Sequence, residues 1–202
     1  MEKKREAVER IADAVRRIAV HYGLWFSESV HQFGVEQALE MEQEAGNAAF
    51  GLALKRVCKA AGIPLEQGLP KQMLRMEESE LENILNSLAI SWLAADGVWF
   101  QAVEKAAGMD DAKRVNDTCW SRFSPLEARR IMSLLGIKEN GGLSALADAL
   151  SCRMYSRINT QEIEWESDRV MVLRMRECRV QAARKRKGLP DYPCKSGGVV
   201  EY

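Results

Sequence analysis

The sequence predicts a predominantly helical α+β protein, in which two pseudo-symmetric three-helix halves are followed by a C-terminal β-hairpin and a short helix. Three observations support this fold class. Apolar residues recur at helical spacing over the first 158 residues, one helical segment is repeated 74 residues later, and the pattern changes after Asn159 to the two-residue alternation of strands. A chain of 202 residues can bury a core without disulfide or metal cross-links.

The repeat consists of residues 23–63 and 97–137, which align without a gap. Trp25 aligns with Trp99, and each is followed by Phe. The chain has only five Trp and five Phe, so this register is hard to obtain by chance, although coincidence between two amphipathic helices is the alternative. Two copies are too few for a solenoid and predict two like halves about a pseudo-twofold axis.

The first half begins with a long amphipathic helix. Its apolar stripe has the spacing of one helix face and consists of Val8, Ile11, Ala12, Val15, Ile18 and Ala19. Gly34 and its repeat equivalent Gly108 predict helix ends, because only glycine enters the positive-φ region cheaply. Gly62 and Gly136, each followed by Ile, predict two more.

The second half is predicted to start at a capping box of Ser79 and Glu82, after a linker over residues 64–78. Ser124 and Pro125 indicate a further helix start, so each half is expected to contain a long, a short and a third helix. One more helix is expected over residues 143–154.

The C-terminal segment changes character. Ile163 and Trp165 alternate with glutamates, and Val170, Val172, Arg174 and Arg176 then alternate with Met171, Leu173 and Met175. This pattern predicts a β-hairpin in which the acidic face of one strand pairs with arginines of the other. A helix is expected over residues 178–188, followed by irregular, flexible chain.

These elements predict a duplicated helical domain at 1–158, with repeat halves 1–63 and 79–137, and a hairpin, basic helix and tail packed on it at 159–202. Acidic and basic residues number 29 each, so no global field favours nucleic acid. The chain has no signal peptide and no long apolar run, so no membrane is expected. Five scattered cysteines indicate reduced thiols and a cytoplasmic location.

The first candidate ligand site combines aromatic and acidic residues. Trp25 and Glu28 share one helix face with His21 and Gln32, a mixture that suits a ligand pocket, and Trp99 is the repeat equivalent of Trp25. Ordinary helix packing with Trp25 half-buried is the alternative, and an aromatic stripe containing Trp99 also fits a core.

Glu28 and His31 form a Glu-x-x-His motif, as found in di-iron bundles. The repeat lacks both residues and the chain has only two His, which argues against a di-iron centre.

The second candidate site is a pair of cysteines, Cys178 and Cys194. They flank a basic cluster and could supply two soft ligands to zinc, with His21 or His31 completing the site. Structural or free thiols are the alternative. The basic cluster, Arg179 and residues 184–187, fits either phosphate contacts or the solvated end of a helix.

Two segments carry a family resemblance. Residues 24–26 with Gly34 and Ala38, together with Cys178–Leu189 and residues 193–195, resemble an uncharacterised prokaryotic "cytosolic protein" family with a domain of unknown function. Those proteins usually continue with a short cysteine-bearing tail, so a site completed by that tail is expected to be absent or altered here. A distant likeness to the L-2-amino-thiazoline-4-carboxylate hydrolase-like group implies small-molecule binding.

The leading expectation is therefore a protein that binds a small molecule or metal through a helical pocket and the C-terminal cysteine segment. One alternative is a hydrolase of small C–N or C–S substrates, in which Cys178 or Cys194 is activated by a neighbouring cation. The other is a helical homodimeric interaction module with an exposed apolar stripe.

Overall fold

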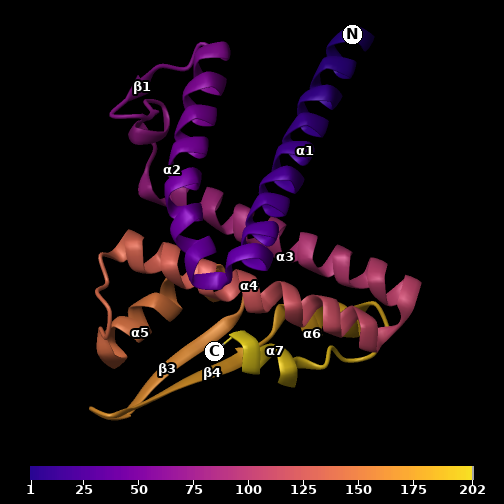
Figure 1. Cartoon of the computed structure of the whole chain (residues 1–202), viewed down its shortest axis with the longest axis vertical. Coiled ribbons are helices and arrows are strands. Elements are labelled where there is room, and N and C mark those ends of the chain that lie inside the picture. Colours follow the sequence, from indigo (N-terminus) through magenta and orange to yellow (C-terminus); the bar gives the residue numbers. More distant parts are fainter. Residues whose placement is uncertain (202) are drawn as a thin grey trace. The chain divides into compact units, whose positions relative to one another are not determined.

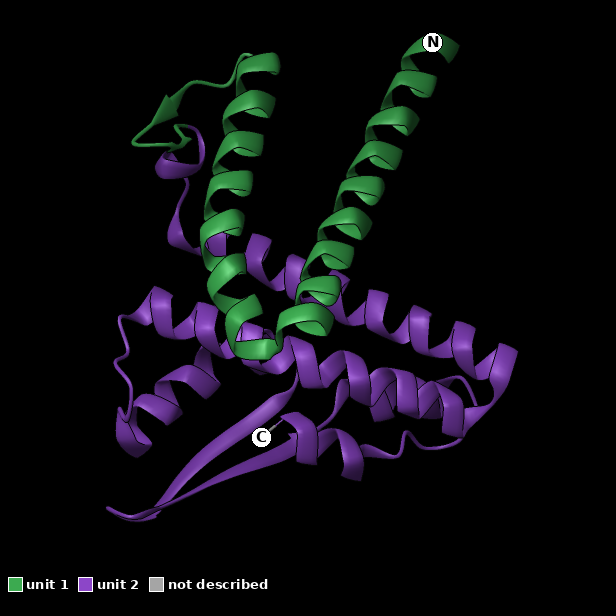
Figure 2. Cartoon of the chain, viewed as in Figure 1, with its two compact units in different colours: residues 1–71 green, residues 72–202 purple. Residues whose placement is uncertain are grey.

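The computed structural model describes residues 1–201 and divides into two compact units, residues 1–71 and 72–202 (Figures 1 and 2). The fold is predominantly α-helical with two small antiparallel strand pairs, which confirms the predicted fold class. Within residues 1–201, no helix combines the length and apolarity needed to cross a bilayer.

The first unit is a helical hairpin with a small appendage. Helices α1 (Glu2–Phe33) and α2 (Val35–Ala60) are joined by Gly34 alone, and strands β1 (Leu65–Glu66) and β2 (Leu69–Pro70) pair in the predicted linker. Gly34 has φ 82° and ψ 166°, a conformation that is essentially restricted to glycine and reverses the chain in one residue.

The second unit repeats this hairpin and adds a C-terminal layer. After η1 (Met73–Arg75), helices α3 (Glu78–Ala107) and α4 (Met109–Leu135) are joined by Gly108 with φ 91° and ψ 172°. The added elements are α5 (Gly142–Cys152), η2 (Met154–Arg157), β3 (Thr160–Ser167), β4 (Val170–Glu177), α6 (Arg179–Arg186) and α7 (Cys194–Glu201). Both α5 and α7 pack against α4, and η2 packs against α3.

The two copies of the repeat share more than their helices. The Tyr22 hydroxyl donates to Glu42 across the first hairpin at 2.7 Å, and Asn116 donates to Asp96 across the second at 3.1 Å. These pairs occupy equivalent positions at the shift of 74 residues. The repeat is therefore real at the level of each hairpin, whereas packing of the two halves about a pseudo-twofold axis stays a prediction.

Each copy contains two helices where three were expected. The helix start predicted at Ser124-Pro125 is wrong, because α4 continues through Pro125. Trp120 and Glu127 are buried on either side of the proline, so tertiary packing outweighs the loss of one backbone hydrogen bond. The predicted capping box at Ser79 and Glu82 lies two residues too late; Glu77 and Glu80 form it instead.

All four predicted glycine stops lie at helix ends with positive φ. The ends of α2 and α4 are also equivalent. The Ile63 amide donates to the Cys58 carbonyl at 2.8 Å, and the Ile137 amide donates to the Met132 carbonyl at 2.9 Å. Each is the long bond of a Schellman motif, which needs a left-handed residue just before the donor.

The predicted hairpin is confirmed as the antiparallel pair β3–β4. Arg174 donates to Glu164 at 2.9 Å and Arg176 donates to Glu162 at 2.7 Å, as the alternating charges predicted. The flexible tail predicted around Ser196 is wrong, because these residues form α7. The domain boundary predicted at 158/159 stays a prediction; the hairpin and tail lie in the same compact unit as α3 and α4.

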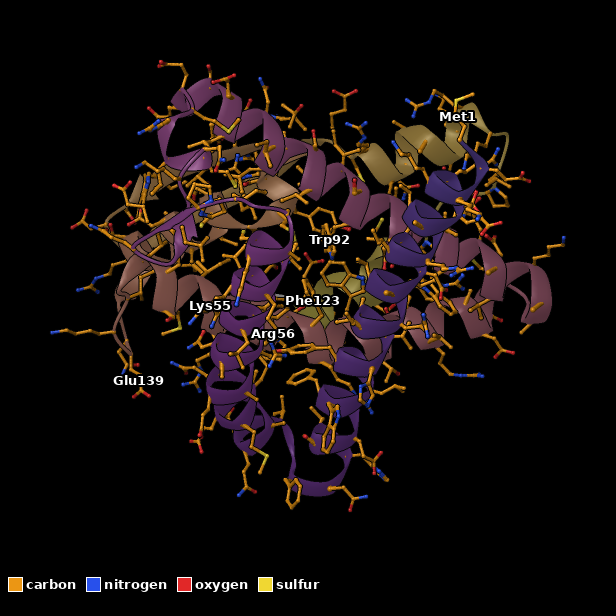
Figure 3. All side chains as sticks on the ribbon, turned by 90° about the horizontal axis from the view of Figure 1, so that it is seen from above. Met1, Lys55, Arg56, Trp92, Phe123 and Glu139 are labelled. Atoms are coloured by element: carbon orange, nitrogen blue, oxygen red, sulfur yellow. The ribbon has the colours of Figure 1, made fainter. Side chains whose placement is uncertain are left out.

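The core of the second unit contains an aromatic cluster. Trp92, Trp120, Phe123 and Tyr155 contact one another with ring centroids 5.3–5.7 Å apart. Figure 3 labels Trp92 and Phe123 in this cluster. Trp99 does not join it and is 71% exposed, so the alternative of a core stripe containing Trp99 is wrong for that residue.

Candidate functional site

The second unit contains a cavity of about 290 Å³ between α3, η2, α6 and the chain that leads to α7. Its wall is mostly apolar and includes Ile90, Leu93, Val98, Phe100 and Val180. The polar side chains in the wall are Asp96, Gln101, Tyr155, Arg179, Arg184, Lys187 and Tyr192. An apolar cavity with a few convergent polar groups is the usual form of a small-molecule site.

Two amphipathic helix faces form the cavity. On α3, Leu93, Asp96, Gly97 and Phe100 follow the i, i+3, i+4, i+7 pattern and face it together. Val180, Ala183 and Arg184 on α6, together with Lys187 directly after its end, follow the same pattern. The cavity is therefore built from regular helices, which hold side chains more rigidly than loops do.

A hydrogen-bond chain ends at Asp96 in the cavity wall. Lys113 Nζ donates to Tyr192 Oη at 3.0 Å, Tyr192 Oη donates to Asn116 Oδ1 at 2.5 Å, and Asn116 Nδ2 donates to Asp96 Oδ1 at 3.1 Å. Each hydrogen bond is donated in the same direction along the chain, from Lys113 towards the Asp96 carboxyl. Such chains polarise their members and fix the position of the terminal acceptor.

Burial perturbs the titratable groups of this chain. It raises the pKa of Asp96, although the hydrogen bond from Asn116 and the charge of Lys113 act in the opposite direction. Burial also raises the pKa of Tyr192, against the effect of Lys113. For Lys113 burial alone would lower the pKa, but hydrogen bonds with Asp117 and Tyr192 raise it overall. The network thus contains a lysine that is held in its charged form and a carboxyl whose pKa is raised by burial.

Arg184 holds α6, which forms one side of the cavity, in place. Its guanidinium is buried and forms two bonds to the Glu104 carboxylate, at 3.0 and 2.9 Å, and a third to the Pro190 carbonyl at 2.5 Å. The bidentate pair ties α6 to α3. Gln181 completes the arrangement by donating to the Tyr192 carbonyl at 2.7 Å and accepting from the Tyr192 amide at 3.0 Å.

The three ligand-binding residues predicted from the sequence do not line this cavity. Trp25 and Glu28 lie on α1 in the first unit, where Trp25 is 68% exposed. Glu28 is exposed, and hydrogen bonds, first from Gln32 and then from His31, lower its pKa. Trp99 lies between two lining residues, Val98 and Phe100, but points elsewhere on the helix. Ligand binding by these three residues stays a prediction.

In the described chain, Cys178 and Cys194 are not joined by further metal-ligating side chains. Cys178 is half-buried at the start of α6, and Cys194 is exposed at the start of α7, where its Sγ lies 3.0 Å from Gln181 Nε2. Among residues 1–201, no group of three or more His, Cys, Asp or Glu side chains could hold a metal ion. Zinc binding by the two cysteines stays a prediction.

A second cavity of about 520 Å³ lies between α4, α5 and β4. Its polar groups neutralise one another: Arg153 donates to Glu127 at 2.9 Å and to Glu201 at 2.6 Å. In the same wall, Ser124 Oγ is buried without a hydrogen-bond partner. The smaller cavity is the better candidate, because its carboxyl is perturbed rather than ion-paired.

Sequence reasoning missed Asp96, Asn116 and Tyr192. One signal was available. Asp96 interrupts an apolar run from Trp92 to Phe100, and at the same shift of 74 residues Asp96 and Asn116 align with two polar residues, Tyr22 and Glu42. No sequence pattern connects Tyr192 to them, because it is 76 residues from Asn116.

Comparison with known proteins gives a family and no assigned activity. No curated protein and no solved structure matches this sequence. One family model matches residues 2–77 and residues 71–202, and the overlap of these two segments contains the boundary between the two compact units in the sequence. The matches cover almost the whole chain, which therefore belongs to the family of unknown function DUF6125.

Proposed function

We propose that this protein binds a small organic molecule in the cavity between α3 and α6, and that it does so in the cytoplasm. The single observation that supports this most directly is the Asp96 carboxyl, which has a raised pKa and lies at the end of a hydrogen-bond chain in a mostly apolar wall. Keeping a carboxyl in such surroundings is unfavourable for folding, so a functional role offers a reason for it.

The wall suggests the chemistry of the ligand. Asp96 would accept a hydrogen bond from an amine or amide, the apolar side chains would contact a hydrocarbon body, and the exposed cations Arg179 and Lys187 would attract an anionic group. A volume of about 290 Å³ is at the lower end of the range for ligand pockets. A small amphoteric molecule, such as a free amino acid with an apolar side chain, fits these three requirements.

Binding has more support than hydrolysis. A cysteine nucleophile must reach the substrate, and neither Cys178 nor Cys194 lines the cavity. Hydrolysis of a C–N or C–S bond by these cysteines would require a different site and stays a prediction.

The experiment is to screen free amino acids and their amides by thermal shift, and to measure the affinity of the best compounds by calorimetry. Gly97→Leu is the decisive variant, because Gly97 lines the cavity and an added Cβ would meet only the end of Gln101, at 4.0 Å. Its side chain would fill the cavity and reduce affinity at least about 100-fold, since the ligand would lose most of its apolar contacts.

The repeat supplies the matched control. Gly23 is the equivalent glycine of the first unit and has nothing within 4 Å of an added Cβ. Gly23→Leu should leave binding unchanged. Equal binding by wild type and Gly97→Leu, or loss of binding in Gly23→Leu alone, would refute this site.

A further inference from the structure

Helix α1 presents an apolar seam that its own unit does not cover. None of its 32 residues is buried. Val8, Ile11, Val15, Ile18 and Trp25 are each 62–68% exposed. A contiguous apolar stripe of this length is rare on the surface of a monomer and usually marks an interaction surface.

The seam has the period of a coiled coil. Counting from Met1, positions at alternating steps of three and four residues are Met1, Lys4, Val8, Ile11, Val15, Ile18, Tyr22 and Trp25. The positions directly beside the central seam are alanines: Ala7, Ala12, Ala14 and Ala19. Such small flanking residues allow another helix to approach closely along the seam.

Helix α2 covers only one end of this seam. Tyr22 contacts Phe50 with ring centroids 5.2 Å apart and donates to Glu42 at 2.7 Å. From there towards the N-terminus the two helices diverge, which leaves the four aliphatic residues without a helix opposite them in their unit (Figure 1). The surface available for a partner therefore centres on Ile11 and Val15.

We propose that α1 pairs in antiparallel orientation with α1 of a second copy of this chain. Setting Ile11 opposite Val15 of the second copy also sets Val8 opposite Ile18. The same register brings Lys4 near Tyr22, which α2 already covers, and sets Met1 opposite the exposed Trp25. The uncovered part of the seam, from Val8 to Ile18, is therefore complementary to itself.

Charge within the seam itself favours the antiparallel orientation. A parallel pair would set Lys4 against Lys4, whereas the antiparallel pair places the two Lys4 side chains at opposite ends. The charged residues outside the flanking alanines are already paired within the helix: Glu9 with Arg5 at 2.9 Å, Arg10 with Glu6 at 3.6 Å and Arg17 with Asp13 at 2.9 Å.

The buried area is of the size that a dimer needs. Covering the four aliphatic side chains and Trp25 would remove on the order of 500 Å² of apolar surface per copy. The stems of Lys4 and Met1 and the flanking alanines add to this. The total approaches the roughly 800 Å² per partner of a stable protein–protein interface.

The test uses the full chain in sedimentation equilibrium, with far-UV circular dichroism as the check on folding. Wild type is expected to dimerise. Val15→Glu places a charge opposite Ile11 of the second copy, on both sides of the centre of the dimer. It should weaken dimerisation at least about 100-fold with unchanged helicity. Val20→Glu is the matched control: Val20 is a valine on the same helix, 54% exposed, but lies on the opposite face, and its variant should dimerise like wild type.

Orientation is tested by disulfide trapping, with the exposed Cys119 and Cys194 replaced by serine. Val8 lies opposite Ile18 in the antiparallel register and opposite itself in a parallel pair. A cross-linked dimer is therefore expected from Val8→Cys combined with Ile18→Cys and not from Val8→Cys alone; cross-linking of Val8→Cys alone would refute the antiparallel register. Monomeric wild type at 100 µM would overturn the proposal. So would equal effects of Val15→Glu and Val20→Glu, or a monomer destabilised by Val15→Glu, which would mean that the seam packs on its own chain. Ligand binding in the second unit is a separate measurement, so either proposal can fail alone.

Discussion

Replacing Arg184 by methionine tests whether the buried ion pair holds α6 against α3. Methionine keeps most of the apolar stem but removes the two bonds to Glu104 and the bond to Pro190. Breaking a fully buried pair typically costs 3–5 kcal/mol. The Glu104 side chain is 19% exposed and water would solvate it partly, so the cost should be about 2–3 kcal/mol.

The assay is urea unfolding followed by circular dichroism at pH 7. A loss of about 2–3 kcal/mol should lower the midpoint of the second unit by roughly 1 M. Lys185→Met is the matched control, because Lys185 is the exposed neighbour on the same helix, and its variant should change stability by less than about 0.5 kcal/mol.

The pH dependence gives the refuting result. The hydrogen bond from Arg184 lowers the pKa of Glu104 below its usual value of 4.5, against a smaller opposing effect of burial. A carboxyl with a lowered folded-state pKa stabilises the fold above pH 4.5, and that contribution is lost as the pH falls through the folded-state pKa. The gap between wild type and Arg184→Met should therefore shrink below pH 4.5. A gap below 1 kcal/mol at pH 7, or one that stays constant down to pH 3, would refute the reasoning.

Three further predictions follow from single residues. Burial raises the pKa of Asp96 above 3.8, so the contribution of the Asp96 carboxyl to stability falls as the pH rises through its folded-state pKa. Asp96→Asn should therefore be more stable than wild type at pH 7 but not at pH 3, as measured by urea unfolding at both pH values. Ser124→Ala removes an unpartnered buried hydroxyl and should raise thermal stability by about 1 kcal/mol, whereas a loss would reveal a partner for that oxygen. Gly108→Ala should cost about 1–3 kcal/mol at its φ of 91°, while Gly51→Ala, within α2 and with open space around it, should stabilise by about 0.5–1 kcal/mol; equal effects in chemical denaturation would contradict this.

The candidate site was only partly accessible from the sequence. The resemblance drew attention to the segment from Cys178 to Cys194, and that segment does line the cavity. It contributes Arg184 and Tyr192 rather than its cysteines. The reason is physical: a cysteine stands out in a sequence because of its chemistry, whereas the role of Tyr192 depends on Gln181, Lys113 and Asn116, which the chain brings together only on folding.

The sequence by itself determined the local structure of this protein. The register of 74 residues identified two equivalent helical segments, glycines marked the helix ends, and alternating charges marked the β-hairpin, because each of these depends on backbone conformation and on neighbours along the chain. The 3.5-residue period of α1 is also a property of the sequence alone.

Only the tertiary structure decided which faces these elements cover. Trp25 and Trp99 are large apolar residues of the kind usually found in a core, yet both are exposed. Lys113 and Asn116 are polar, yet both are buried. Pro125 lies inside a helix because the residues around it are packed. Burial is set by contacts between residues far apart in the chain, and a helical period shows that a face is apolar without showing what will cover it.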